Sequence, residues 1–126
     1  MNSNSMEACC PVKPELGSRP LLTEEQAVSL EQTFKILANG TRLRILHALF
    51  LAEEICVTDL ADTLGMKPTA VSNQLQRLAF SGIIESRRAG NQIFYRIVDP
   101  CVVKLLDSAW CLTADAEARV RERSGN

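Results

Sequence analysis

The stretch from residue 58 to residue 82 constrains the fold of this chain more than any other. It predicts a short helix over 58–64 with Thr58 as N-cap, a turn at Gly65, and a longer helix that Pro68 begins and Gly82 terminates. Two helices and a turn within about 25 residues have the spacing of a helix-turn-helix. Residues 83–87 and 92–97 then have the composition of two strands, and Ala89-Gly90-Asn91 between them is typical of a hairpin. Together these elements predict a winged helix-turn-helix, which is a mainly α fold with one β-hairpin.

Further helices are predicted before this unit, and the length of 126 residues allows a single domain. Thr23 and Gln26 form a capping-box pattern that begins one helix, and Asn39-Gly40 ends it. Its apolar face is Val28, Leu30, Phe34, Leu37 and Ala38. A second helix starts at about Thr41, and its expected buried residues are Leu43, Ile45, Leu46, Leu49 and Phe50. We expect a flexible arm over 1–22, the winged-helix domain over 23–113 and a charged tail over 114–126.

The helix that Asp99 and Pro100 begin is unusually apolar for the end of a small protein. Seven of its eleven residues from 102 to 112 are apolar: Val102, Val103, Leu105, Leu106, Ala109, Trp110 and Leu112. Such a helix could pack on its own domain alone, or also against another chain. The number of apolar positions exceeds one buried stripe and favours the second reading. We therefore expect Val103, Leu106 and Trp110 to lie in a dimer interface.

Charge is distributed unevenly along the chain, although its net charge is only −1. Between residues 67 and 96 there are five basic residues and one acid, Glu85, which gives this segment +4 and leaves −5 for the rest. The basic residues are Lys67, Arg77, Arg87, Arg88 and Arg96. One basic face on an otherwise acidic protein is a candidate phosphate-binding surface.

The longer helix of the pair carries short polar side chains opposite its apolar face. Amides can pair bidentately with adenine, and hydroxyls serve several base edges. No acid occurs between Lys67 and Phe80, which fits an element that lies among phosphates. A plain amphipathic helix and a solvated charged turn are the alternatives. We expect double-stranded DNA to be contacted by Lys67, Thr69, Ser72, Asn73, Gln76 and Arg77 on the helix and by Arg87, Arg88 and Asn91 on the hairpin.

Several classes of protein are excluded. No apolar run approaches the roughly 18 residues of a membrane span. The N-terminus has neither the basic nor the apolar region of a signal peptide, so a cytoplasmic protein is expected. An enzyme such as a thiol reductase is not supported, because there is no Cys-x-x-Cys, no glycine-rich phosphate loop and no histidine near a cysteine.

Five cysteines and one histidine, His47, are the candidate sensor residues, and in the cytoplasm the thiols would be reduced. This donor set favours soft ions: mercury(II), cadmium, lead, arsenite or copper(I). Cys56 precedes the first helix of the helix-turn-helix, whose N-terminus favours the thiolate that binds metal. Cys9 and Cys10 lie together on the predicted arm. Cys101 and Cys111 are about 15 Å apart along one helix and cannot share an ion within one chain.

A structural role is the alternative for three of these cysteines. Cys56 could be a small buried hydrophobic residue, which is the commoner fate of a lone cysteine. Packing and ligation are equally supported for Cys101, whereas packing is favoured for Cys111. A thiol redox switch without metal is the alternative function, since the same cysteines could oxidise to a disulfide.

Several linked motifs in residues 30–110 resemble the ArsR/SmtB metal-sensing repressors. They are Ala38-Asn39-Gly40-Thr41-Arg42-Leu43-Arg44-Ile45-Leu46, Glu54-Ile55-Cys56-Val57-Thr58-Asp59-Leu60-Ala61, Val71-Ser72-Asn73-Gln74-Leu75 and Leu78-Ala79-Phe80-Ser81-Gly82-Ile83-Ile84. The resemblance implies a homodimer built on the first and last helices, and repression of an operator that metal binding relieves. Asn73-Gln74 differs from the histidine-containing pair of many members.

The resemblance also bears on the ligands. Related sensors have a second cysteine where this chain has Thr58, so Cys56 needs a ligand from elsewhere. Cys9-Cys10 resembles the vicinal pair of some arsenic-sensing members. Asp99 and Cys101 resemble the start of the dimer-helix site of zinc sensors, which is otherwise incomplete here. The whole combination is most similar to actinobacterial mercury-resistance regulators, which implies mercury(II), with cadmium, lead and arsenite as further candidates.

Overall fold

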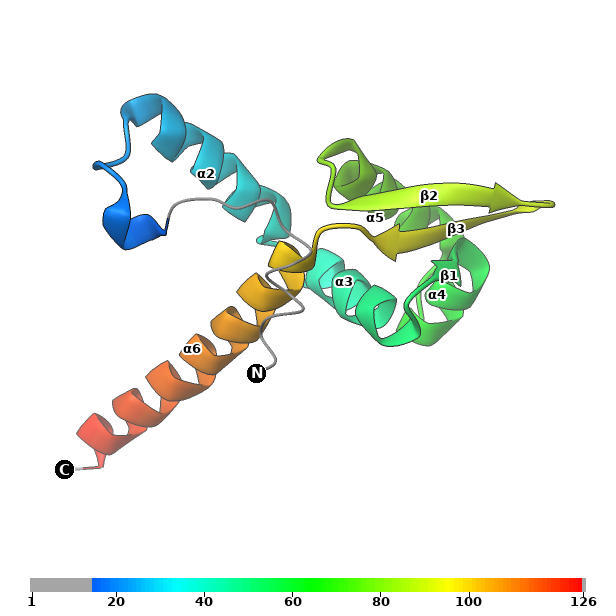
Figure 1. Cartoon of the computed structure of the whole chain (residues 1–126). Helices are drawn as coiled ribbons and strands as arrows, with labels where there is room; N and C mark the ends of the chain where they lie inside the picture. The colour runs from blue at the N-terminus through cyan, green and yellow to red at the C-terminus, as the bar shows by residue number, and fades with distance from the viewer. Residues whose placement is uncertain (1–14, 126) are drawn as a thin grey trace, which may run out of the picture. The chain divides into compact units, whose positions relative to one another are not determined.

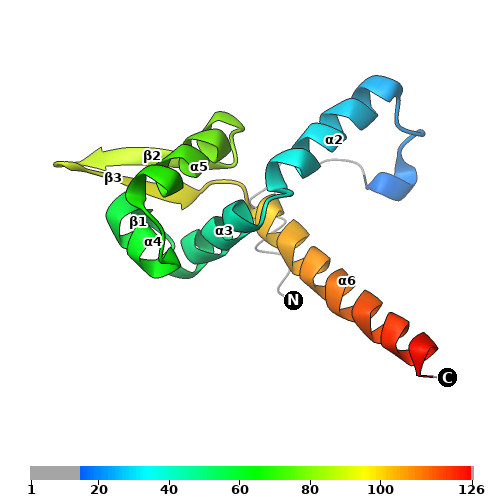
Figure 2. The ribbon, with the colours of Figure 1, turned by 180° about the vertical axis from the view of Figure 1, so that it is seen from behind.

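The computed structural model describes residues 15–125, and these divide into two units. One unit contains residues 15–98 and the other consists of the last helix, α6 (Pro100–Ser124), with its flanking residues. The first unit contains a short 3₁₀ turn (Leu16–Ser18), helices α2 (Glu24–Leu37), α3 (Gly40–Ala52), α4 (Val57–Leu64) and α5 (Pro68–Phe80), and strands β1 (Ile55–Cys56), β2 (Ile84–Ala89) and β3 (Gln92–Ile97). Figures 1 and 2 show β2 and β3 as one long hairpin beside α5.

This element order confirms the winged helix-turn-helix. α4 and α5 are joined by a turn in which Gly65 adopts a left-handed φ of 68°, and its N–H bonds back to the carbonyl oxygens of Ala61 and Asp62. A residue with a side chain is strained in that conformation, so glycine suits the turn. Pro68 occupies the first turn of α5, as predicted, where its missing N–H leaves no bond unmade.

The core of the first unit lies between α3, α4 and α5. Its largest fully buried side chains are Ile45, Leu46, Leu49, Leu60, Val71, Leu75 and Leu78. The predicted burial of Leu43 and Phe50 is wrong, because these side chains are 38% and 54% exposed. α3 also carries apolar side chains away from the side that packs against α4, α5 and β3, and these stay exposed among the described residues. Val28, Leu30 and Phe34 of α2 are exposed in the same way.

The N-cap residues of α2, α3 and α4 define where these helices begin, and the N-cap of α4 differs from the prediction. Thr23 and Gln26 form the predicted capping box, with bonds of 3.0 and 3.1 Å. Asn39 accepts a 3.0 Å bond from Arg42 N and therefore caps the start of α3. The prediction of Thr58 as the N-cap of α4 is wrong, because Cys56 occupies that position and the helix begins at Val57. The cause is β1, which ends at Cys56 and leads directly into the helix.

The sheet has three strands in the order β1-β3-β2, all antiparallel. β2 and β3 pair from Ile84 with Ile97 to Ala89 with Gln92, so a two-residue loop, Gly90-Asn91, joins them. Gly90 has the positive φ of 66° that such a tight hairpin loop requires at its first position. β1 was not predicted, since two residues carry no periodic signal. It pairs Ile55 with Tyr95 and Cys56 with Phe94.

α6 continues to Ser124, so most of the predicted tail from residue 114 is helical. The segment is rich in alanine, glutamate and arginine, which favour helix without an apolar stripe. The predicted arm over 1–22 is described only from residue 15, and Cys9 and Cys10 lie outside the described residues. Among residues 15–125, no helix is both long and apolar enough to cross a bilayer.

Candidate functional site

α5 presents the predicted polar face. Val71, Leu75 and Leu78 are buried in the core, which fixes the rotation of the helix. Ser72 is half-buried, and its hydroxyl lies 3.4 Å from Gln76 Nε2. The polar side chains left exposed along the same helix and its N-cap are Lys67, Thr69, Asn73, Gln76 and Arg77. The amides and hydroxyls that could contact base edges therefore gather on the solvent side of α5.

Gln74 has a partner that the sequence did not indicate. Its Oε1 accepts a 2.9 Å bond from Arg42 Nη1, and Arg42 Nε donates a 2.6 Å bond to the carbonyl oxygen of Ile36. Arg42, which lies in the first turn of α3, therefore connects the C-terminal end of α2 to α5. This contact spans 32 residues, and no local pattern could have revealed it.

The hairpin presents Arg88, Asn91 and Gln92 as exposed side chains near its tip. Two of the five basic residues of the predicted basic face are paired with acids. Arg87 binds Glu54 through two bonds of 2.7 and 2.8 Å, and Arg96 pairs with Glu85. Lys67, Arg77 and Arg88 have no ion pair with any residue in 15–125. These three cations are the ones available to phosphates.

Glu54 lies at the base of the hairpin, and sequence reasoning missed it. The hydrogen bonds from Arg87 lower the pKa of the Glu54 carboxyl below its ordinary value, and the same bonds raise the pKa of Arg87. The Arg87 guanidinium also lies 5.1 Å from the centre of the Phe94 ring. Arg87 was predicted to contact DNA, whereas in this structure its guanidinium is bound within the protein.

The cysteines occupy different environments. Cys56 is 2% exposed, at the junction of β1 and α4, which matches the structural alternative for this residue. Cys101 and Cys111 are exposed on α6. Asp99 caps that helix by accepting a 2.9 Å bond from Cys101 N. His47 is exposed on α3.

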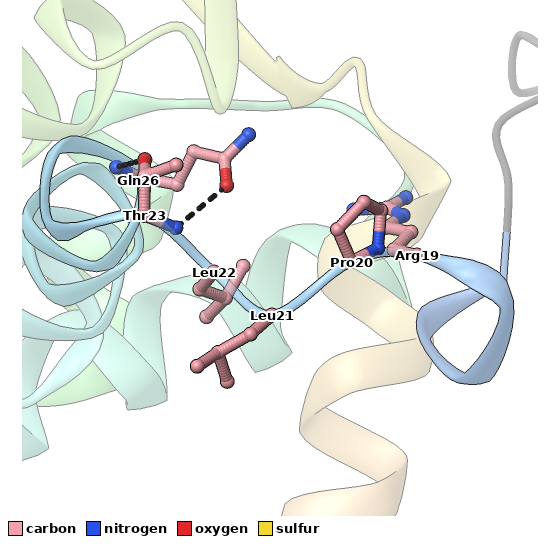
Figure 3. Close-up of a pocket in the computed structure, with 6 residues that line it drawn as sticks. All are labelled: Arg19, Pro20, Leu21, Leu22, Thr23 and Gln26. Carbon is pink, nitrogen blue, oxygen red and sulfur yellow. Dashed lines mark hydrogen bonds between the residues drawn. The ribbon is translucent and has the colours of Figure 1, made fainter.

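No three histidine, cysteine or acidic side chains gather into a metal-binding group within residues 15–125. Cys56 is the one cysteine in residues 15–98, so this unit itself brings no second thiol to it. A pocket at the start of α2 adds no ligand (Figure 3), since none of its lining residues is a cysteine, histidine or acid. These residues are Arg19, Pro20, Leu21, Leu22, Thr23 and Gln26.

The predicted interface residues lie along one face of α6. Val103, Leu106 and Trp110 are spaced at intervals of three and four residues, which places them on one side of a helix. Trp110 is 74% exposed, whereas Val103 and Leu106 are half-buried. An exposed tryptophan in line with Val103 and Leu106 gives α6 an apolar surface of the kind that another chain covers.

Comparisons with known proteins agree with this geometry. The family model for bacterial regulatory proteins of the arsR family matches residues 39–86. A solved structure described as the AntR antimony-specific transcriptional repressor is 54% identical, covering 86% of this chain and 98% of that one, with a TM-score of 0.73. The homodimeric winged helix-turn-helix DNA-binding domain of a possible ArsR-family regulator from Mycobacterium bovis is 32% identical, covering 80% and 95%, with a TM-score of 0.65. The arsenical resistance operon repressor of Escherichia coli is 36% identical over 71% of this chain and 80% of that protein.

Proposed function

The chain belongs to the ArsR family of bacterial regulatory proteins, and we propose that it binds operator DNA as a homodimer and leaves it when a thiophilic ion binds its cysteines. It is a transcriptional repressor by family. Its relatives are transcriptional regulators and not enzymes, which confirms the prediction from the sequence that this protein is not an enzyme. The observation that carries the DNA-binding part is the exposed face of α5, which has amides, hydroxyls and cations but no acid. A regulator of operator DNA acts in the cytoplasm, as expected from the sequence.

The cations that form no ion pair with another described residue support the same proposal. Lys67 and Arg77 lie at opposite ends of α5, and Arg88 lies on the hairpin. Phosphates follow the edges of the major groove, so a helix in that groove needs cations at its ends and on the element beside it. We therefore assign phosphate contact to these three residues, and base contact to Asn73 and Gln76 with Thr69 and Ser72.

The donor set supports a soft ion. Zinc, nickel and cobalt sites usually contain imidazole or several carboxylates, and this chain has one histidine, exposed on α3. Mercury(II) was the ion expected from the sequence, and it stays a prediction. The relatives that are described as an antimony-specific repressor and an arsenical resistance operon repressor add antimony(III) and arsenite to the ions to be tested.

We assign Cys56 as the central ligand, with Cys9 or Cys10 as its partners. The burial of Cys56 bears directly on how the ion could act. A thiol that is 2% exposed is covered by its neighbours while β1 and α4 pack as they do here, so solvent does not bring an ion to it directly. The ion would therefore bind another conformation of this junction, and such selective binding is what allows a ligand to shift a protein between states.

A gel-shift titration of the reduced protein on its operator tests the proposal. We expect mercury(II), antimony(III), arsenite, cadmium or lead to release the DNA at ion concentrations where zinc, nickel and cobalt do not. A phosphine reductant keeps the thiols reduced without supplying one, so release under these conditions also separates metal sensing from a thiol redox switch. Release only after oxidation would support the redox alternative.

Asn73→Ala is expected to weaken operator binding by about 1–3 kcal/mol, because an amide that pairs with a base carries that much discrimination. Fluorescence anisotropy with the operator and with single-base variants measures this. The loss should disappear for one base-pair variant, since the wild-type contact is already absent there. An equal loss on every sequence would show that Asn73 does not contact a base.

Arg88→Ala is expected to weaken binding to all sequences alike and to reduce the slope of log K against log salt by about 1. The physical reason is the loss of one phosphate contact and of the counterions that it displaces. Titrations at several salt concentrations measure the slope. A slope equal to that of the wild type would remove Arg88 from the DNA interface.

A further inference from the structure

A row of three residues crosses the sheet from the Cys56 segment to the hairpin. In the strand register, Cys56 of β1 faces Phe94 of β3, and Phe94 faces Arg87 of β2. Residues directly opposite one another in an antiparallel sheet have neighbouring side chains on one face. The buried thiol is thus connected to the hairpin through one aromatic ring.

A second connection joins the neighbouring residue Glu54 to the same arginine. Glu54 lies two residues before Cys56, and both of its carboxylate oxygens accept bonds from Arg87, at 2.7 and 2.8 Å. The Arg87 guanidinium lies 5.1 Å from the centre of the Phe94 ring, so Phe94 holds it from the other strand. The Arg87 side chain therefore contacts both the segment that carries Cys56 and the central strand.

The backbone before Glu54 has little freedom. Glu53 ends α3 with a φ of 68°, which side chains rarely adopt, and among the described residues it is the one non-glycine with positive φ. Three residues later, Cys56 is the N-cap of α4. A displacement of Cys56 therefore moves Glu54 as well, because the segment between the two helices is too short to absorb it.

We infer that Arg87 is a positioning residue that transmits ion binding at Cys56 to the hairpin, through Glu54 and Phe94. The inference rests on the proposed function and specifies its regulation. A bidentate bond between guanidinium and carboxylate requires both groups in one plane. When Glu54 moves with Cys56, the bond draws the Arg87 side chain with it and shifts β2, the strand that carries Arg88.

The other ion pair of the hairpin provides a matched control. Arg96 and Glu85 form an exposed pair in which both residues belong to the hairpin. The charge of Arg96 also helps to lower the pKa of Glu54, so the control substitution is made at Glu85, which lies on β2, a strand that does not pair with β1. Exposed pairs contribute little to stability, so either can be removed without unfolding the protein. Substitution of Glu85 therefore removes an acid from an ion pair of the hairpin and leaves the two bonds between Arg87 and Glu54 in place.

The test compares operator affinity with and without saturating mercury(II) chloride, or potassium antimonyl tartrate if only antimony releases the wild type. We expect the ratio of the two dissociation constants to be about 100 for the wild type. Glu54→Gln and Arg87→Gln should each lower this ratio to below about 10, and the double variant should lower it no further, since both act through one contact. Glu85→Gln should keep the wild-type ratio.

Two outcomes overturn the inference and identify what failed. If the wild type responds and Glu54→Gln and Arg87→Gln respond equally well, the connection is absent and the proposed function stands. If no thiophilic ion releases the wild type, the proposed function fails and the inference falls with it. Phe94→Leu removes only the ring contact and should lower the ratio as well, which keeps the test decisive if Glu54→Gln melts at a lower temperature.

Discussion

Leu106→Glu is expected to convert the dimer into monomers and to lower operator affinity by at least about 100-fold. Leu106 lies between Val103 and Trp110 on one face of α6, and a carboxylate buried in an apolar interface has no compensating partner. A monomer contacts only one half-site, so it loses the second set of DNA contacts. Sedimentation velocity measures the oligomeric state, and anisotropy measures the affinity.

Ser108→Glu is the matched control for this substitution. It places the same charge two residues further along the exposed helix, about 200° around its axis from Leu106. We expect this variant to stay dimeric and to bind the operator like the wild type. Circular dichroism confirms that both variants keep their helices. An intact Leu106→Glu dimer would exclude this face of α6 as the interface.

The helix-turn-helix could be predicted because its signals are local. Gly65 in a left-handed turn, Pro68 in the first turn of α5 and Gly90 in a two-residue loop each mark a boundary by their own backbone preference. The period of apolar residues in α5 then fixes its polar face. β1 lacks both kinds of signal, and it exists only because Tyr95 and Phe94, about 40 residues later, offer it an edge.

The contacts that position the site could not be predicted. Arg42 with Gln74 and Arg87 with Glu54 join residues 32 and 33 positions apart, and no periodicity relates such pairs. A count of charges assigned Arg87 to DNA, and it could not reveal that this exposed guanidinium pairs with Glu54. For Leu43 and Phe50, hydrophobicity alone predicted burial, but α3 has more apolar surface than the described residues cover.

Cys56→Ser is expected to keep repression and to abolish the response to the thiophilic ion, changing an approximately 100-fold release to less than about 2-fold. A 100-fold release requires the ion to favour the free protein by about 2.7 kcal/mol, or about half of that per site in a dimer. Removal of the sulfur removes that preference. The fold should survive, because Cys56 is the N-cap of α4 and makes no side-chain cap bond, and serine is a favoured residue there. Anisotropy titrations with and without the ion measure both affinities.

The other cysteines distinguish a site at Cys56 from one elsewhere. Cys9→Ser and Cys10→Ser should each weaken the response, because the β1–α4 junction supplies one thiol and a stable thiolate site needs at least two. The double variant should lose most of the response. Cys111→Ser, which changes an exposed thiol ten residues beyond Cys101, should respond almost as the wild type does. If Cys56→Ser still leaves the operator at the wild-type ion concentration, the ion acts through α6, and Cys101→Ser should then abolish the release.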